Sequence, residues 1–439
     1  MRRRLLILIL FALALRLAAV FAIREYERPN VWESGVIARS LVEGRGFAFD
    51  WRAMLGPAVE PDRASAWWPP LYPLFLAACH VIAPGAPYLA ANLAQAVLSA
   101  LVPLFLFVIG RRLFGAREGW IAALLAAAHP PLLGFSALIQ TAILEIFCTT
   151  LAILLFVIAG GWAAAAHRAP SRGAEHDRLG ERGAGSPAFA ALGGIATALA
   201  ALTRPPALAL LAIAPLAWRL GGHTLRRTAL LSLAALLGAA ALIAPWTARN
   251  HHVRGEWVLI SANGGWNLFL GNNPAGTADR ADVGRAVPRE LRERLLTMNE
   301  VEADRALRAL ALEYIRGNPA RAASLVLARA RNLLWFNPEF GSSSGYSSAL
   351  ARWTRPVYML TWALLVVVAV TGMAATRPIW RRLILLYGAI AANAAVILAT
   401  FFVNRYRAPI EPILILFAAA AIARWTRPVG RDGKEPTET

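Results

Sequence analysis

The chain has 439 residues, of which 58% are hydrophobic and 16% are charged, and its formal net charge at pH 7 is +19. Apolar runs of about 20 residues recur along it, and a helix of that length crosses the ~30 Å hydrocarbon core of a bilayer. This composition argues against a soluble enzyme and predicts an integral membrane protein. The arginines lie mainly in short loops between apolar runs, where they set topology, so we expect no nucleic-acid partner.

About ten apolar segments are predicted to cross the membrane, within a range of about nine to twelve. With ten spans, the clusters of arginine and lysine between the segments all fall on one side, which the positive-inside rule makes cytoplasmic. We therefore expect an all-α polytopic protein in the inner (plasma) membrane of a bacterium. The predicted spans are residues 5–23, 88–109, 119–133, 142–158, 189–202, 207–220, 229–244, 356–374, 383–402 and 409–423.

The first long polar loop, residues 24–69, lies on the outer side in this topology. Val31–Val42 within it has the spacing of an amphipathic helix that lies on a membrane surface. The apolar segment Leu71–Val81 is too short to span, and the two prolines before it favour a helix start. We predict that both segments form interfacial helices.

The second outer loop, residues 246–355, is polar enough to fold as a small subdomain, with helical patterns at 301–312 and 320–334. The cytoplasmic loop 162–187 is rich in Gly, Arg and Glu without periodicity, which predicts disorder. Three regions follow from these loops. They are an N-terminal membrane module (1–245), the second outer loop (246–355), and C-terminal spans with a short cytoplasmic tail (356–439).

Arg16 lies in the apolar body of the first span. A charged residue in that position is costly and usually faces protein, water or a partner. We expect Arg16 to contribute to a substrate site. Snorkelling of the guanidinium toward the outer interface is the alternative.

The other polar residues within or beside the spans gather on the outer side. Guanidinium groups hold phosphate oxygens in a fork, and a carboxylate accepts the proton of an attacking hydroxyl. Arginine-tipped helices around an acidic loop therefore predict a site for a lipid-linked phosphate. Its candidate members are Glu33, Tyr72, Gln140, Thr141, Glu145, Arg204, Arg249, Asn250, Asn263, Asn272, Arg405, Tyr406 and Arg407.

Several short motifs occur in a fixed order along the chain. The first is ESGVIARSLVEGRGF at 33–47, followed by PPLYP at 69–73 and LTRP at 202–205. The later motifs are PWTARN at 245–250, NGGWNL at 263–268, GNNP at 271–274 and RYRAP at 405–409. Together they resemble GT-C class membrane glycosyltransferases, with the family 39 protein O-mannosyltransferases and aminoarabinose transferases as the nearest group.

The resemblance implies a GT-C-like bundle that transfers a sugar from a polyprenyl-phosphate donor to a lipid, glycan or protein acceptor on the outer face. It places the acid of the first loop, Glu33, as the base or acceptor-orienting group, with Glu145 as a second catalytic acid. Arg204, Arg249 and the 405–407 motif are then expected to bind the donor phosphate. The remaining candidates are expected to bind substrate: Arg16, Tyr72, Gln140, Thr141, Asn250, Asn263 and Asn272.

The chain departs from the family pattern at two positions. Glu33 stands where aspartate is common, which keeps the charge but moves it by one methylene. Relatives often carry an acid in the short loop before the fourth span, whereas Gln140 and Thr141 are neutral. Glu145 follows one helical turn later on the face of Thr141 and is the candidate to substitute for that acid.

Structural interpretations stay open for several of these residues. Glu33 is equally placed to cap or solvate the amphipathic helix, and Glu145 to form a structural pair with an arginine. Arg204, Arg249 and Arg405 have the alternative role of interface anchors. The Asn263–Asn273 stretch contains dipeptides that mark turns.

The alternative functions are a non-catalytic lipid-carrier-binding protein or transporter of similar architecture, and a structural assembly partner. A transporter is expected to show internal repeats and broken helices at the midplane, which the sequence does not show clearly. No nucleotide-binding loop, zinc-protease motif or Cys/His ligand spacing occurs. We expect no metal and no cofactor, and as partners the lipid-linked donor, the acceptor and membrane lipids.

Overall fold

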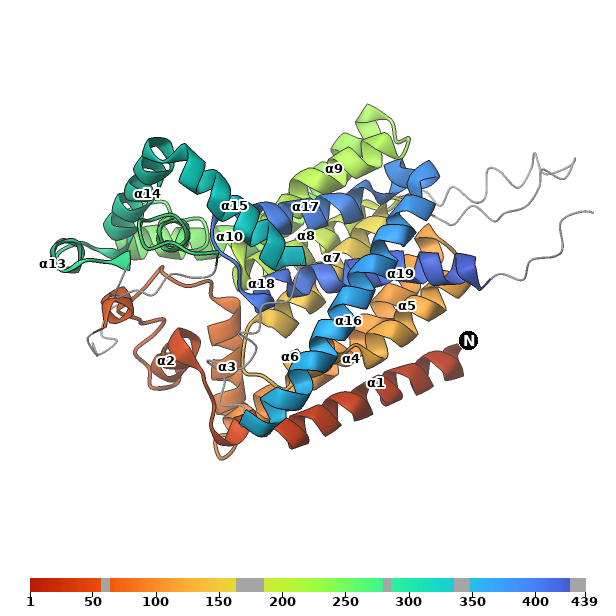
Figure 1. Cartoon of the computed structure of the whole chain (residues 1–439), viewed down its shortest axis with the longest axis horizontal. Coiled ribbons are helices and arrows are strands. Elements are labelled where there is room, and N and C mark those ends of the chain that lie inside the picture. The colour runs from red at the N-terminus through yellow and green to blue at the C-terminus, as the bar shows by residue number, and fades with distance from the viewer. Residues whose placement is uncertain (57–63, 163–184, 279–285, 335–347, 427–439) are drawn as a thin grey trace, which may run out of the picture.

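The computed structural model describes residues 1–56, 64–162, 185–278, 286–334 and 348–426. Across these residues the chain is helical, apart from one isolated bridge between Ala48 and Ala64. The predicted all-α class is therefore confirmed, and Figure 1 shows the long helices running side by side in one bundle. Most of the loop predicted to be disordered, 162–187, lies outside the described residues, as does the tail beyond Thr426.

Seven segments among the described residues are long and apolar enough to cross a membrane, and a bent helix pair makes an eighth. The chain is thus a multi-pass membrane protein. The two other predicted spans, 189–202 and 207–220, correspond to apolar helices that are shorter than a full crossing. The long helices are α1 (Arg2–Ile23), α4 (Pro87–Leu113), α7 (Ala142–Ala159), α10 (Leu225–Arg254), α16 (Ser348–Ala375), α17 (Ile384–Ala399, preceded by η4, Arg377–Leu383) and α19 (Glu411–Trp425).

The bent pair consists of α5 (Ala116–Ala128) and α6 (Pro130–Ser136), which meet at 49°. Pro130 and Pro131 have no backbone N–H, so the carbonyls of Ala126 and Ala127 lose their helical partners four residues ahead. The fully buried Arg16 supplies the missing donors. Its Nη1 donates to the Ala127 carbonyl at 2.9 Å and its Nη2 to the Ala126 carbonyl at 3.2 Å.

Arg16 also donates to Ser99 Oγ on α4 at 2.7 Å, so it joins α1, α4 and the break between α5 and α6. Its guanidinium is occupied inside the bundle. These contacts support a structural role, and the expectation that Arg16 contributes to a substrate site stays a prediction. This structural role also differs from snorkelling, because the donors point to protein carbonyls.

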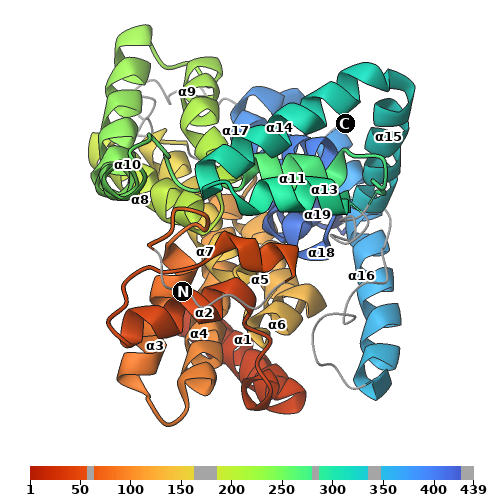
Figure 2. The ribbon, with the colours of Figure 1, turned by 90° about the vertical axis from the view of Figure 1, so that its left-hand side faces the viewer.

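One end of the bundle, which we call the loop end, carries the two long polar loops (Figure 2). The predicted helices at 31–42, 71–81, 301–312 and 320–334 are confirmed there, with slightly different bounds. Two further helices, α11 and α13, were not predicted. The helices of the loop end are α2 (Trp32–Val42), α3 (Leu71–Ile82), α11 (Gly264–Gly271), α13 (Arg289–Leu296), α14 (Glu300–Gly317) and α15 (Pro319–Leu334).

The two polar loops pack against each other as one unit. Trp67 of the first loop meets Trp266 of α11 edge to face at 6.0 Å, and both belong to one apolar cluster with Ile37 and Leu307. The buried carboxylate of Glu300 accepts from Ser65 Oγ at 2.8 Å and from the Ala66 N–H at 2.5 Å. A shared core of this kind fixes the first loop over the helix ends.

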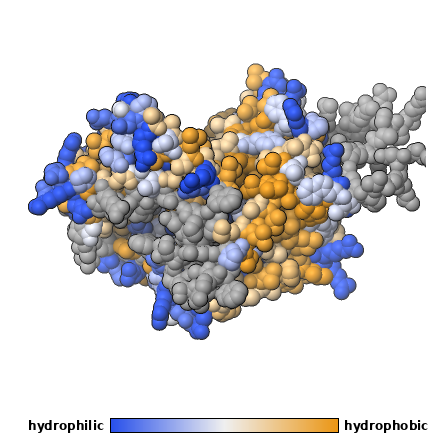
Figure 3. Space-filling view, viewed as in Figure 1, coloured by the Kyte–Doolittle hydropathy of each residue, from blue (hydrophilic) through white to orange (hydrophobic). Residues whose placement is uncertain are grey.

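The opposite end of the bundle gathers basic residues. Three arginines there make hydrogen bonds to other segments of the chain. Arg111 contacts Met1, Arg112 donates to the Trp162 carbonyl, and Arg117 donates to Thr426. Between the two hydrophilic ends, apolar side chains cover the helices in Figure 3. This arrangement matches the one-sided distribution of basic clusters that the sequence predicts.

Candidate active site

An ion pair at the loop end joins two membrane helices. Glu145 lies in the first turn of α7 and is 3% exposed, and its Oε2 is 3.2 Å from Arg204 Nη1. Arg204 is an extended residue between α8 (Pro187–Thr203) and η3 (Pro205–Ala209). Proline at the next position disfavours helical geometry, so the helix ends there and the arginine points out of it. Glu145 thus has the arginine partner that the structural alternative foresaw.

Tyr406 packs under this arginine. The guanidinium carbon of Arg204 lies 3.7 Å from the ring centroid of Tyr406, within the range of a cation–π contact. Tyr406 belongs to α18 (Asn404–Arg407), a single turn followed by η5 (Ala408–Ile410). Three elements far apart in sequence, α7, the α8–η3 break and α18, therefore meet here.

Arg405 adds a second cation. Its guanidinium carbon is 5.7 Å from the Tyr406 ring, and it interacts electrostatically with Glu145. Two guanidinium groups around one carboxylate leave an excess of positive charge. An anionic group such as a phosphate monoester fits this excess, because guanidinium forks bind its oxygens with two parallel hydrogen bonds.

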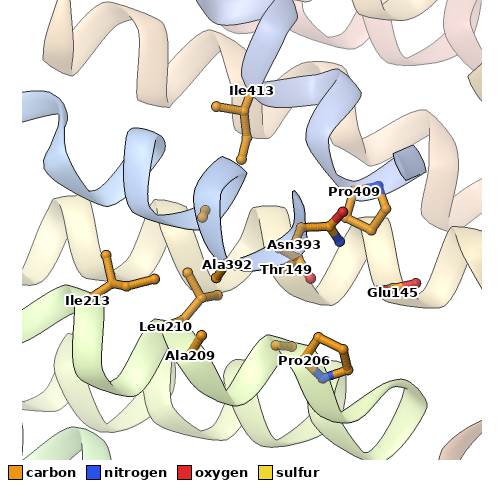
Figure 4. Close-up of a pocket in the computed structure, with 12 residues that line it drawn as sticks. Glu145, Thr149, Pro206, Ala209, Leu210, Ile213, Ala392, Asn393, Pro409 and Ile413 are labelled. Atoms are coloured by element: carbon orange, nitrogen blue, oxygen red, sulfur yellow. The ribbon is translucent and has the colours of Figure 1, made fainter. Parts of the chain in front are cut away.

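A hollow opens beside the ion pair, with an empty volume of about 390 Å³ when open solvent is included. Figure 4 shows its lining side chains, which come from α7, from η3 and α9 (Leu210–Leu220), from α17, and from η5 and α19. Nine of the twelve lining residues are apolar. The full set is Glu145, Thr149, Pro206, Ala207, Ala209, Leu210, Ile213, Ala389, Ala392, Asn393, Pro409 and Ile413.

Glu33 lies in the first turn of α2 and is half-buried. One turn further along α2, Ile37 belongs to the apolar cluster of Phe401 and Tyr406, while Ala38 belongs to that of Leu144. The helix that carries Glu33 therefore shares apolar clusters with sequence neighbours of both Arg405 and Glu145. The base role of Glu33 stays a proposal.

Arg249 makes contacts of a different kind from Arg204. Its Nη2 donates to the Phe47 carbonyl at 3.2 Å, its Nη1 donates to the Ser65 carbonyl, and it stacks near the Trp246 ring. It therefore ties the first loop to α10. Its neighbour Asn250 is fully buried and donates to the carbonyls of Val258 and Ile260. These contacts support positioning roles in the loop end, and the expected roles of the two residues in binding phosphate and substrate stay predictions.

Arg407 is completely buried, unlike Arg405. Its Nη2 donates to the Tyr358 hydroxyl at 2.9 Å, and its guanidinium lies 3.8 Å from the Trp362 ring centroid. Glu411, four residues later, receives a 2.7 Å hydrogen bond from His129 at the α5–α6 break. This buried network anchors the turn that carries Arg405, and the expected role of Arg407 in binding donor phosphate stays a prediction.

The remaining expected substrate residues divide into buried and half-buried ones. Tyr72 is buried and donates to Gln95 Oε1 at 3.2 Å, and Asn272 donates to the carbonyls of Leu268 and Ala399. Both side chains hold helices together, and their expected role in binding substrate stays a prediction. Gln140 and Thr141 are half-buried in the turn before α7, and Asn263 accepts from Ser261 at the start of α11. For these three residues the substrate role stays a prediction.

Several residues that shape the site were missed from the sequence. Arg329 is fully buried and donates to the Leu398 carbonyl at 2.8 Å, which joins α15 to the end of α17. Asp304 accepts from the Gly265 and Trp266 N–H groups and so caps α11 from another helix. Burial raises the pKa of the Glu25 carboxyl to about 7, against backbone hydrogen bonds from Ile139 and Asn30 that lower it. Their partners are remote in sequence, so local pattern gives no signal.

A family model described as dolichyl-phosphate-mannose-protein mannosyltransferase matches residues 68–162. That segment runs from the end of the first polar loop through α7 and includes Glu145. Archaeal oligosaccharyltransferase AglB from Archaeoglobus fulgidus, solved with an inhibitory peptide and a dolichol-phosphate, aligns with a TM-score of 0.52 at 14% identity. The chain has the GT-C fold. The resemblance that the ordered motifs carry is therefore confirmed at the level of fold.

The alignment with the oligosaccharyltransferase covers 96% of this chain and 50% of that protein, so the chain spans half the length of the relative. The same archaeal enzyme solved with Zn and sulfate aligns at a TM-score of 0.51 and 14% identity, covering 96% of this chain and 48% of that one. ArnT from Cupriavidus metallidurans bound to undecaprenyl phosphate aligns at 0.45 with 15% identity, covering 95% and 77%. No curated protein sequence matches the chain.

Proposed function

We propose that the protein is a glycosyltransferase that moves a sugar from a polyprenyl-phosphate donor to an acceptor hydroxyl at the outer face of the membrane. The observation that carries this proposal is the cluster of Glu145, Arg204, Tyr406 and Arg405 at the loop end of a GT-C fold. The neighbouring structures with bound dolichol-phosphate or undecaprenyl phosphate support a lipid phosphate as the ligand class.

The proposed step is a single displacement at the anomeric carbon. The acceptor oxygen forms a bond to that carbon as the bond from the carbon to the phosphate oxygen breaks, with inversion. The electron pair leaves with the polyprenyl phosphate, and Arg204 and Arg405 stabilise its growing negative charge in a site of low dielectric constant. The acceptor hydroxyl gives its proton to a carboxylate.

Two carboxylates are candidates for the proton acceptor. The family resemblance favours Glu33, which lies in the first turn of α2 at the loop end. The structure favours Glu145 in one respect, because it is the acid that lines the hollow and contacts Arg204. If Glu33 is the base, Glu145 acts by holding Arg204 in position.

The loop end is proposed to face the outside. The short connections at the other end carry arginines such as Arg111 and Arg117, and the positive-inside rule, which counts short loops, makes that end cytoplasmic. The hydrophobic surface between the two ends then lies in the bilayer (Figure 3). The donor sugar would approach from the side of α2, α11 and α14.

Transfer can be assayed in proteoliposomes with polyprenyl-phosphate-mannose, by following release of polyprenyl phosphate. The two variants to compare are Glu33→Gln and Glu145→Gln. The variant that removes the base is expected to lower the turnover rate about 10²–10⁴-fold, and the other variant is expected to lower it less. Glu293→Gln serves as the matched control, since Glu293 is exposed and pairs only with Arg289 four residues away. Binding of polyprenyl phosphate without any release on turnover, in a protein that is folded, would favour the non-catalytic carrier-binding alternative.

A further inference from the structure

The hollow contains a polar side chain that the catalytic cluster does not use. Asn393 lies within the apolar helix α17 and lines the hollow. Its Oδ1 is buried and has no hydrogen-bond partner in the described part of the chain. A buried carboxamide oxygen without a partner destabilises the fold relative to a well-packed apolar group at the same position. The empty protein therefore carries an uncompensated acceptor.

Asn393 lies well below the ends of its helix. It precedes the last residue of α17, Ala399, by six residues, which at 1.5 Å per residue is about 9 Å. Thr149 of α7 lies at a similar depth from the helix start at Ala142, about 10 Å. Figure 4 shows the Asn393 amide and the Thr149 hydroxyl in the same part of the hollow, with Glu145 nearer the loop end.

The chemistry of the lining limits what the hollow can hold. Glu145 contributes a carboxylate and Asn393 an unpaired carbonyl oxygen, both of which accept hydrogen bonds. Neither Arg204 nor Arg405 lines the hollow, so a phosphate inside it would contact the Glu145 carboxylate, while the arginine paired with that carboxylate stays outside the lining. The other lining residues are Thr149, whose hydroxyl both donates and accepts, and Ala, Leu, Ile and Pro side chains. The matching ligand donates hydrogen bonds from an uncharged group and is otherwise apolar.

We propose that the hollow binds the hydroxyl end of a largely apolar alcohol, with Asn393 as the residue that selects for the hydroxyl. The phosphate of the donor then stays outside the hollow, on Arg204 and Arg405. In terms of the proposed transfer, on which this assignment of the ligand as acceptor rests, the acceptor class is a lipid alcohol that enters from the membrane. The binding itself is measurable without any transfer.

A purely structural role for Asn393 makes the opposite prediction for the empty protein. If its amide stabilised the fold, its replacement by leucine would lower the melting temperature. If it is kept for a ligand, Asn393→Leu removes an unpaired acceptor from an apolar setting. The variant is then expected to melt about 2 °C higher than the wild type without ligand.

The test measures thermal stabilisation of the detergent-solubilised full chain by geranylgeraniol and by its methyl ether, which has the same hydrocarbon but cannot donate. Wild type is expected to bind the alcohol about fivefold to tenfold more tightly than the ether, the value of one hydrogen bond. Asn393→Leu is expected to bind the two probes equally. Geranylgeranyl phosphate is expected to bind wild type and Asn393→Leu alike, because its phosphate lies on the arginines.

Asn92→Leu is the matched control. Asn92 is a buried asparagine in a membrane helix, and its Oδ1, like that of Asn393, has no hydrogen-bond partner in the described part of the chain. It differs from Asn393 in two respects: its Nδ2 donates to the Ser136 carbonyl at 3.4 Å, and it does not line the hollow. Its replacement is expected to lower the melting temperature while discrimination between alcohol and ether persists.

Three results would overturn the proposal. One is a lower melting temperature for ligand-free Asn393→Leu, and another is an equal loss of phosphate binding in that variant. The third is stabilisation by methyl mannoside that depends on Asn393, which would assign the hollow to the donor sugar. Loss of transfer activity in the wild type would refute the proposed function alone, because the probe measurements do not depend on it.

Discussion

Replacement of Arg16 by methionine is expected to lower the free energy of unfolding by about 3 kcal/mol. The guanidinium makes hydrogen bonds to the carbonyls of Ala126 and Ala127 and to Ser99 Oγ, all inside the bundle. Each buried carbonyl that loses its donor costs about 1–3 kcal/mol, which gives about 2–6 kcal/mol for the pair. Removal of the buried charge offsets part of this cost, because burial of the guanidinium carries a desolvation penalty in the parent protein.

The reasoning assigns this cost to two particular prolines, and a double-mutant cycle isolates them. With Pro130→Ala and Pro131→Ala, residues 130 and 131 regain N–H groups that can reach the orphaned carbonyls. In that background Arg16→Met is expected to cost about 1–2 kcal/mol less than in the parent. Unfolding of each variant in mixed micelles, followed by far-UV circular dichroism, gives the four free energies. An equal cost of Arg16→Met in both backgrounds would refute the link between the arginine and the helix break.

Arg405→Gln is expected to weaken binding of polyprenyl phosphate about tenfold with little change in melting temperature. Arg407→Gln is expected to lower the free energy of unfolding by about 3 kcal/mol, because it leaves the buried Glu411 with one partner fewer. Equal effects of the two variants on binding and on stability would contradict this division. Because burial raises the pKa of Glu25 to about 7, its contribution to stability is present below the unfolded value of about 4.3 and is lost as pH rises through the folded value. Melting temperatures should therefore fall from pH 5 to pH 8, and Glu25→Gln should flatten that fall; an unchanged slope would count against it. Glu300→Ala is expected to lower the free energy of unfolding by about 2–4 kcal/mol. It is also expected to speed hydrogen exchange at the Ala66 amide, because the N–H loses its carboxylate acceptor. Unaltered exchange at Ala66 would disprove that this hydrogen bond holds the first loop.

The spans and the loop-end helices were predictable because hydropathy and helical periodicity are local properties. Long apolar runs identify α1, α4 and α7 almost to the residue, and the 31–42 pattern identifies α2. The bend between α5 and α6 was not predicted, because the sequence pattern indicated one continuous span at residues 119–133. The two adjacent prolines in the sequence indicate that two carbonyls lose their N–H donors. They do not indicate which side chain supplies the missing donors.

Side-chain roles were predictable only where a residue's partner is itself conspicuous. Glu145 and Arg204 are charges in apolar surroundings, and each is the other's partner. Arg249, Arg407 and Tyr72 look equally functional in sequence, yet they bind backbone carbonyls or buried side chains that no local pattern reveals. Asn393 was overlooked for the converse reason, since a lone asparagine in an apolar run carries no motif and its importance lies in the partner it lacks.

Proline breaks explain both the structural arginines and those proposed to bind ligand. At the α5–α6 break, Pro130 and Pro131 expose two carbonyls, and Arg16 from another helix turns inward to satisfy them. At the α8–η3 break, Pro205 forces Arg204 itself into an extended conformation, so the arginine leaves its helix and reaches Glu145 and Tyr406. An arginine that reaches a helix break from another helix therefore uses its hydrogen bonds on backbone carbonyls. An arginine that lies within a break extends its guanidinium group toward the site. This distinction favours Arg204 over Arg16 as a ligand-binding candidate, although both are arginines in apolar surroundings.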